Sequence, residues 1–309
     1  MSARVRPSRS RARGSRATTR CGVAALAVTG VWAVVGAPAA VAAPTPAIGA
    51  PVPIPQTCRA AMTLVRPDTT LAMGVVQGRT GTLYSTGHKL GFTPKAMAYL
   101  GTTTNRGITI DRFLVTDPQG RLHRVAVTER PASGGASSVS VTDETIGRGW
   151  GSVRVMVATG PYLYGVTTSG GLRRYAISRT FEVSGAGTIA TSGWSGVTSL
   201  AYGGWWRVGA RDAAEDIVAL TRSGAVKAYM IPRATPKQFT QRTLIARGWG
   251  MFSHLAAGEC QTGKARTLAA LKPDGQVYAY LDANADDQSG KDIRWAGRAA
   301  TGWTGLASD

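Results

Sequence analysis

Short stretches of alternating apolar and polar residues, separated by turn-forming Gly, Asp, Ser and Pro, run through the chain from about residue 58 onward. Alternation places the apolar side chains on one face of a β-strand, and a turn between two such stretches predicts a hairpin. No long segment keeps an apolar period of 3.6 residues, so helices are not expected. Five segments align as hairpins: LVRPDTTLAMG from Leu64, VTDPQGRLHRV from Val115, VTTSGGLRRY from Val166, LTRSGAVKAY from Leu220 and LKPDGQVYAY from Leu271.

The hairpins recur at intervals of 51, 50, 54 and 51 residues, counted between the turn positions Thr69, Gly120, Gly170, Gly224 and Gly275. A second marker recurs in phase with them: Gly149-Trp150, Gly193-Trp194, Gly248-Trp249 and Gly302-Trp303, with Gly87-His88 in the remaining place. Each period then holds four short strands: one after the Gly-Trp marker, two around the turn, and one leading to the next marker. Four antiparallel strands repeated five times predict an all-β, five-bladed β-propeller.

The two ends of the repeat region complement each other. After Trp303 there is room for a single strand at Leu306 to Ser308, and the first repeat, from about Met62, begins at its hairpin and lacks an innermost strand. We therefore predict that the carboxyl end supplies the inner strand of the blade begun at the amino end. Such closure hides strand edges that would otherwise be open to aggregation.

The first 57 residues have a different character. Seven arginines precede an apolar run from Gly22 to about Val35 and an Ala-Val-Ala motif, which predicts a secretory signal peptide over residues 1–42, with a signal anchor as the alternative. The run is too short for a spanning helix, and no later segment is apolar enough to be one, so we expect a secreted, extracellular protein. Five prolines between residues 44 and 55 predict an extended linker over 43–57, outside the core, followed by the propeller over 58–309.

Charge and cysteine usage fit an extracellular protein. The formal net charge is +19, and removal of residues 1–42, with seven Arg and no acid, leaves +12. This surplus favours an anionic cell-surface polymer as partner, without specific nucleic-acid binding; solubility alone is the alternative reading. Cleavage also removes Cys21, leaving Cys58 and Cys260. In the repeat frame these two flank the seam between the last and first blades, so we predict a disulfide there.

The repeat resembles that of the tachylectin family of five-bladed propeller lectins. The resemblance is carried by Gly193-Trp194, Gly248-Trp249, GGLRRY from Gly170 and GAVKAY from Gly224, and it spans about residues 58–309. It implies a five-bladed ring without catalysis that binds N-acetylated sugars in crevices between blades. The repeats of this chain differ in length, with insertions at 128–142 and 205–216, so equal sites in every blade are not expected.

Six tryptophans are candidate ligand-binding residues, because an indole face can stack on a sugar ring. Four belong to the repeat, where the alternative is that each wedges between neighbouring blades; the other two lie in an insertion, where a hydrophobic lid is the alternative. The six candidates are Trp150, Trp194, Trp249, Trp303, Trp205 and Trp206.

Other chemistry has weak support. Asp282, Asn284 and Asp286 match the first, third and fifth ligand places of a calcium loop, but Asp287 stands where Gly is needed and Ile293 where a bidentate Glu belongs. The alternative is a solvated loop. Zinc, phosphate-loop and nucleophile-elbow motifs are missing from the sequence, so neither a further cofactor nor an enzymatic function is expected.

The first functional hypothesis is therefore a secreted carbohydrate-recognition propeller. The second is an envelope-associated protein-interaction or scaffold propeller in which the tryptophans only pack. A secreted glycan-cleaving enzyme is the third. The fold cannot choose among them, because propellers host many functions.

Overall fold

The structure is a computed structural model that describes residues 50–131, 137–208, 212–261 and 264–308. The predicted signal peptide and residues 43–49 of the predicted linker lie outside the described residues. The described residues belong to one compact unit. Within the described ranges the regular structure is β-strand, apart from two single-turn 3-10 helices, η1 (Pro236–Gln238) and η2 (Ala285–Asp287). None of the helices described has the length and hydropathy that a bilayer crossing requires.

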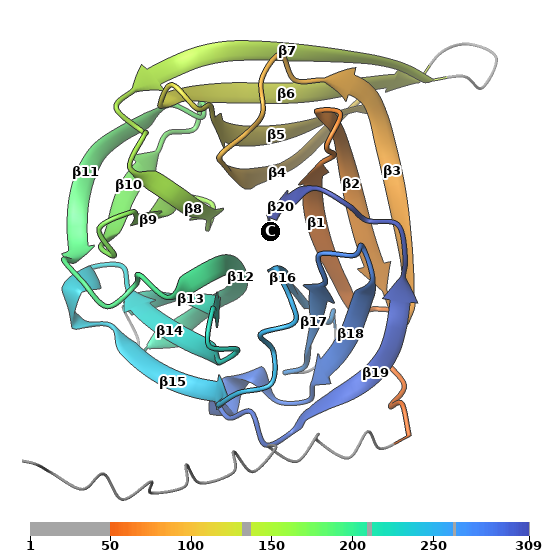
Figure 1. Cartoon of the computed structure of the whole chain (residues 1–309), viewed down its shortest axis with the longest axis vertical. Coiled ribbons are helices and arrows are strands. Elements are labelled where there is room, and N and C mark those ends of the chain that lie inside the picture. The colour runs from red at the N-terminus through yellow and green to blue at the C-terminus, as the bar shows by residue number, and fades with distance from the viewer. Residues whose placement is uncertain (1–49, 132–136, 209–211, 262–263, 309) are drawn as a thin grey trace, which may run out of the picture. The chain divides into compact units, whose positions relative to one another are not determined.

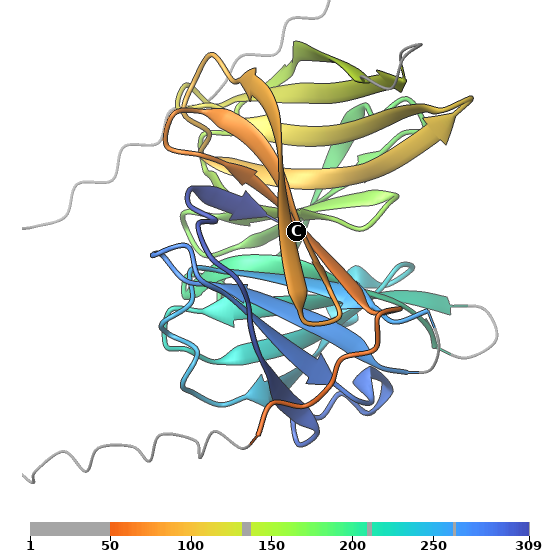
Figure 2. The same cartoon turned by 90° about the vertical axis from the view of Figure 1, so that its right-hand side faces the viewer.

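The strands described form five antiparallel sheets of four, arranged around a common centre (Figures 1 and 2). The predicted five-bladed β-propeller is confirmed. The strands of each blade are given from the innermost to the outermost.

Blade 1 consists of β20 (Leu306–Ser308), β1 (Arg59–Val65), β2 (Thr70–Gln77) and β3 (Thr80–Lys89). Blade 2 consists of β4 (Ala96–Asn105), β5 (Ile108–Thr116), β6 (Arg121–Pro131) and β7 (Ser137–Arg148). Blade 3 consists of β8 (Val153–Ala158), β9 (Tyr162–Thr167), β10 (Leu172–Ile177) and β11 (Val183–Ala190). Blade 4 consists of β12 (Val197–Val208), β13 (Asp212–Thr221), β14 (Val226–Pro232) and β15 (Thr240–Ile245). Blade 5 consists of β16 (His254–Glu259), β17 (Arg266–Leu271), β18 (Val277–Asp282) and β19 (Ile293–Ala300).

The turn that joins the second and third strands is the same in every blade. In blade 3 the N–H of Gly170 donates to the carbonyl of Thr167 at 2.9 Å, and the carbonyl of Gly170 accepts the N–H of Trp194 at 2.9 Å. The five turn residues have φ between 67° and 83°, the left-handed region that glycine adopts at least cost. Thr69 takes this conformation in blade 1. The turn therefore fixes the blade's own hairpin and also the Gly-Trp marker that follows it.

The four repeated tryptophans are wedges between neighbouring blades. Between 2% and 8% of each is exposed. The ring of Trp194 packs against Tyr229 of blade 4 with 4.2 Å between centroids, and the equivalent distances are 4.4 Å for Trp150 with Tyr175 and for Trp249 with Tyr280. Each of these tyrosines lies five residues after its turn glycine. A tryptophan from one blade thus packs against a tyrosine from the next, which is the packing role that the sequence left open.

Leu90 takes the tryptophan's place in blade 1. Its N–H donates to the carbonyl of Thr69 at 3.0 Å, as the tryptophan N–H groups do in the other blades, and only 2% of the residue is exposed. The alignment of Gly87-His88 with Gly-Trp was wrong, because Gly87 and His88 still belong to β3 and the wedge is Leu90, the residue that follows this strand. Opposite Leu90, Val125 replaces the tyrosine, and both belong to one core cluster.

The last wedge, Trp303, is accommodated by a glycine. Gly74 lies five residues after the blade 1 turn, and a Cβ atom placed on it would be 2.2 Å from Cζ3 of Trp303. We expect Gly74→Val to lower the free energy of unfolding by about 3 kcal/mol through overpacking. Adding Trp303→Leu to Gly74→Val should recover at least half of that loss, because the double variant has a leucine packed against a valine, as Leu90 packs against Val125. Urea denaturation measures both, and a single variant as stable as the parent protein would refute this packing.

The carboxyl-terminal strand closes the ring as predicted. β20 pairs antiparallel with β1, with Thr63 opposite Ser308 and Val65 opposite Leu306. The predicted disulfide between Cys58 and Cys260 is present and joins the start of β1 to the end of β16, across 202 residues of sequence. The seam between blades 5 and 1 is therefore held by covalent and hydrogen bonds together.

Within the described part of the predicted linker, Val52 and Ile54 pack on the propeller, which differs from the expectation of a segment outside the core, whereas the other residues from 50 to 57 are exposed. The N–H of Val52 donates to the carbonyl of Trp295 in β19 at 3.0 Å, and Ile54 is 6% exposed within a core cluster. The prolines at 51, 53 and 55 fix an extended backbone, and the apolar residues between them face the core. The two predicted insertions lie in the lengthened hairpins β6–β7 and β12–β13.

Candidate functional site

A cavity of about 350 Å³ opens at the centre of the ring, at the end where the inner strands of blades 2 to 5 finish. Small-molecule sites in proteins commonly measure about 300–1,000 Å³. We call this cavity the mouth. All five blades contribute to its lining: Arg59, Ala61, Tyr99, Leu100, Gly101, Ala158, Gly160, Tyr202 and Ala257.

Four lining residues occupy equivalent positions on the inner strands of blades 2 to 5. Tyr99, Ala158, Tyr202 and Ala257 each pair with the residue seven places before the turn glycine of their own blade. Two tyrosines and two alanines at the same place in the repeat make the lining of the mouth asymmetric. Unequal side chains converging on one cavity offer a single site, in contrast to one site per blade.

Tyr99 and Tyr202 are anchored in the same way. The hydroxyl of Tyr99 donates to Oδ1 of Asp111 on β5 at 3.0 Å, and Tyr202 hydrogen-bonds to the carboxylate of Glu215 on β13. Burial raises the pKa of Tyr99 to about 12 and also raises that of Tyr202, where the charge of Glu215 adds to the effect. Both phenols are therefore neutral at physiological pH, with their hydroxyls fixed by carboxylates of their own blades.

A glycine bulge follows each of the two mouth tyrosines along its strand. Gly101 and Gly204 each follow their tyrosine by two residues, at a shift in strand register, with φ of 114° and 112°. Trp205 comes next in blade 4 and is 53% exposed. A Cβ on Gly204 would lie 2.7 Å from Oε1 of Glu259, which places this blade 5 carboxylate beside the blade 4 bulge. Trp206 lies in the same strand, and its side chain is outside the described part.

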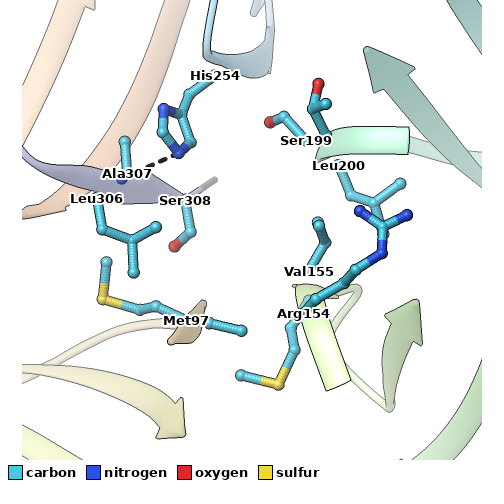
Figure 3. A pocket seen from close by; sticks show the side chains of 12 residues that line it. Met97, Arg154, Val155, Ser199, Leu200, His254, Leu306, Ala307 and Ser308 are labelled. Atoms are coloured by element: carbon cyan, nitrogen blue, oxygen red, sulfur yellow. Dashed lines mark hydrogen bonds between the residues drawn. The ribbon is translucent and has the colours of Figure 1, made fainter. Parts of the chain in front are cut away.

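The opposite end of the inner strands narrows to a hollow of about 30 Å³, the size of one water molecule. Figure 3 shows Met97, Arg154, Ser199 and His254 around it. Nε2 of His254 accepts the backbone N–H of Ala307 at 3.4 Å, and burial lowers the pKa of His254 to about 4, so the ring is neutral at pH 7. This end is packed, and the mouth has the room for a ligand.

Blades 4 and 5 share a buried ionic group. Arg266 donates through Nε to Oδ2 of Asp282 at 2.8 Å and through Nη1 to Oδ2 of Asp216 at 2.6 Å, and all three side chains are at most 2% exposed. Burial raises the pKa of Asp282, although the Arg266 charge acts to lower it. A Cβ on Gly203, next to Tyr202, would lie 2.7 Å from Oδ2 of Asp216, so only glycine fits there. Loss of one member would leave a buried charge unpaired.

The structure does not bring the six candidate tryptophans together. Trp150, Trp194, Trp249 and Trp303 are buried between blades, and the rings of the first three pack against tyrosines, so little indole surface is left for a ligand. Trp205 is the described member with an exposed side chain, in the blade 4 strand that contributes Tyr202 to the mouth.

Two of the three predicted calcium ligands are engaged in ion pairs with basic side chains. Asp282 is held by Arg266, and Asp286 lies 3.1 Å from Nζ of Lys264. Across the described ranges, no group of three or more His, Cys, Asp or Glu side chains is placed to hold a metal ion.

Sequence reasoning missed the two mouth tyrosines. A signal for Tyr202 was present, because it stands at a fixed distance from its Gly-Trp marker at a position where blades 3 and 5 have alanine. A tyrosine that departs from the repeat at an inner-strand position has no packing role shared by all blades, so it is a better ligand candidate than a residue that every blade keeps.

Comparisons with known proteins do not identify a family. No family model matches the chain, and no curated protein matches it. Similar solved structures include human WBSCR16, with 9% identity over 77% of this chain and 79% of that one and a TM-score of 0.29. The computationally designed Ika8 protein is 10% identical over 78% of this chain and 89% of that one, with a TM-score of 0.31. Similarities this low name no family for this chain.

Proposed function

We propose that this protein is a secreted, lectin-like propeller that binds one glycan end, without catalysis, at the mouth. The observation that carries the proposal is the asymmetric lining of Tyr99 and Tyr202 among alanines in a cavity of about 350 Å³. Aromatic rings offer an apolar face to the C–H groups of a sugar, and a few fixed polar groups orient its hydroxyls. Arg59, which lines the mouth, and Glu259 beside the blade 4 bulge are candidate polar groups.

The resemblance to tachylectins supports N-acetylated sugars as the first ligands to test. Tryptophan–tyrosine packing occupies three of the inter-blade spaces where that resemblance would put sugar sites, and for this reason we place the site on the axis of the ring. The Cys58–Cys260 disulfide is compatible with an oxidising extracellular compartment. The basic surplus of the sequence would favour glycans on an anionic cell surface.

A protein partner on the mouth face is the second candidate function. Trp205 is 53% exposed in the lengthened β12–β13 hairpin. Exposed tryptophans are frequent anchors of protein interfaces. In that case the propeller would be an envelope scaffold, and the mouth would not need to hold a sugar.

Glycan-array binding with the full chain tests the proposal. We expect a sugar-specific signal and at least a tenfold loss of affinity in Tyr202→Ala and Tyr99→Ala, because each change removes a stacking face from the mouth. Tyr84→Ala is the matched control, since Tyr84 lies on the outer strand β3 and is 58% exposed. It should bind as the parent protein does.

Thermal melts separate loss of binding from loss of folding in these variants. A mouth variant that binds normally at unchanged stability would contradict the axial site. A silent array, together with capture of a defined protein partner that Trp205→Ala abolishes, would favour the scaffold function. Binding that disappears between low and physiological salt would indicate a charge-driven polymer in place of a sugar site.

A further inference from the structure

The loop between β18 and β19 is rich in side-chain oxygen atoms. Its ends meet where Asp282 pairs with Ile293, and residues 282–292 include four aspartates and one asparagine. Two of the aspartates are already used locally: Asp286 lies 3.1 Å from Nζ of Lys264, and Oδ1 of Asp287 accepts the N–H of Ser289 at 2.6 Å. The remaining three residues are Asp282, Asn284 and Asp292.

These three residues each present a buried oxygen without a hydrogen-bond donor. Oδ1 of Asp282, Oδ1 of Asn284 and Oδ1 of Asp292 are inaccessible to solvent and have no hydrogen-bond partner among the described residues. The Asp282 side chain is fully buried, and its other oxygen is held by Arg266 at 2.8 Å. Buried carboxylate and amide oxygens normally have a hydrogen-bond partner, an ordered water or an ion, so three unpaired ones in a single loop call for one of these.

The three residues flank the base of the hairpin. Asn284 stands two residues after Asp282, on the β18 side. Asp292 directly precedes the register partner of Asp282. The two carboxylates and the amide therefore come from both sides of one chain reversal.

The loop is held in a fixed conformation. A Cβ on Gly290 would lie 1.6 Å from the carbonyl oxygen of Leu244, so this residue must be glycine for the loop to pack on blade 4. The N–H of Ala285 donates to the carbonyl of Lys264 at 2.8 Å. A site built on this loop would lose little conformational entropy on binding, because the chain is already ordered.

The local charge is also unbalanced. Arg266 is shared between Asp216 and Asp282, so with Asp292 the group formally carries three negative charges and one positive charge. Its net charge of −2 is that of a site for a divalent cation.

We propose that Asp282, Asn284 and Asp292 bind a calcium-class divalent cation in the β18–β19 loop. Carboxylate and amide oxygens without nitrogen or sulfur ligands suit calcium, which completes its coordination with water and backbone carbonyl oxygens. The ligand set differs from the one that the sequence suggested, because Asp292 replaces Asp286. The site is separate from the mouth and does not depend on sugar binding.

Isothermal titration calorimetry of the chelator-stripped full chain with CaCl₂ tests the site. We expect one calcium per chain, and a rise of about 3 °C in melting temperature at saturation, because the ion binds the folded state. Asp292→Asn should weaken calcium binding at least tenfold. Asp286→Asn is the matched control in the same loop and should stay within twofold of the parent protein.

Asn284→Ala provides a second variant that leaves the Arg266 ion pairs intact, and we expect it to weaken binding as well. The proposal is overturned if no binding heat and no rise in melting temperature occur up to about 10 mM calcium, above the range of the weakest extracellular sites. It is equally overturned if Asp292→Asn binds normally, or if Asp286→Asn loses binding to the same extent.

Discussion

Replacing both Cys58 and Cys260 with serine should lower the free energy of unfolding by about 5 kcal/mol. The disulfide closes a loop of about two hundred residues, and in the chain-entropy model a loop this long restricts the unfolded chain strongly. For a domain of this size the loss corresponds to a fall in melting temperature of about 10–20 °C. Guanidinium denaturation of the oxidised parent protein and the double variant gives the difference.

Chemical reduction of the parent protein is the control, because it breaks the same bond without changing side-chain volume. Reduced parent protein and double variant should unfold at similar denaturant concentrations. An oxidised protein with two free thiols in non-reducing mass spectrometry would contradict the pairing. A reduced protein as stable as the oxidised one would show that the stability of the seam does not depend on the disulfide.

Deleting residues 306–309 should lower the melting temperature by several degrees or cause aggregation. The deletion removes β20, which pairs with β1, and so exposes the edge of β1 at the centre of the ring. It also removes the backbone N–H of Ala307 that His254 accepts. Differential scanning calorimetry with light scattering measures both outcomes.

A variant of full length separates strand pairing from chain length. Ser308→Pro interrupts the short ladder: the N–H of Ala307 points to His254, so that of Ser308 points to β1, and proline cannot donate. It should shift the melting temperature in the same direction as the deletion. A deletion variant with an unchanged melting curve would mean that the carboxyl end contributes nothing to closure.

Periodicity made the architecture predictable. Turn residues at a spacing of about fifty, with Gly170 and Gly224 among them, show φ near 80° because one backbone conformation is repeated in every blade. Ring closure and the Cys58–Cys260 pairing followed from the phase of the repeats alone. The turn residues and the number of repeats could both be identified in the sequence, and both predict the same five-bladed fold.

Features that depend on packing between blades were not predictable in the same way. The place of Leu90 was missed because the Gly87-His88 pair resembles the Gly-Trp marker, although both residues still belong to β3. Ile54 was assigned to a linker because proline-rich sequence describes backbone conformation but not where it docks. The Arg266 group joins residues about fifty positions apart, on strands whose contact depends on how two blades face each other.

The tryptophans show why the candidate binding site could not be located from the sequence repeats. Repetition marked Trp194 and Trp249 as important, but a residue that every blade needs is more easily explained by packing than by a ligand. Tyr99 and Tyr202 depart from the repeat, and their position at one cavity became visible only with the ring assembled. Deviations from the period are therefore the more informative signal for function in a repetitive chain.

The most direct test of the axial site is the binding stoichiometry of the glycan selected on the array, measured by native mass spectrometry during a titration of the full chain. One asymmetric mouth shared by five blades predicts saturation at one glycan per chain, with Tyr202→Ala abolishing that single bound state. Saturation at several glycans per chain, insensitive to Tyr202→Ala, would contradict the axial site and would place the ligands between the blades.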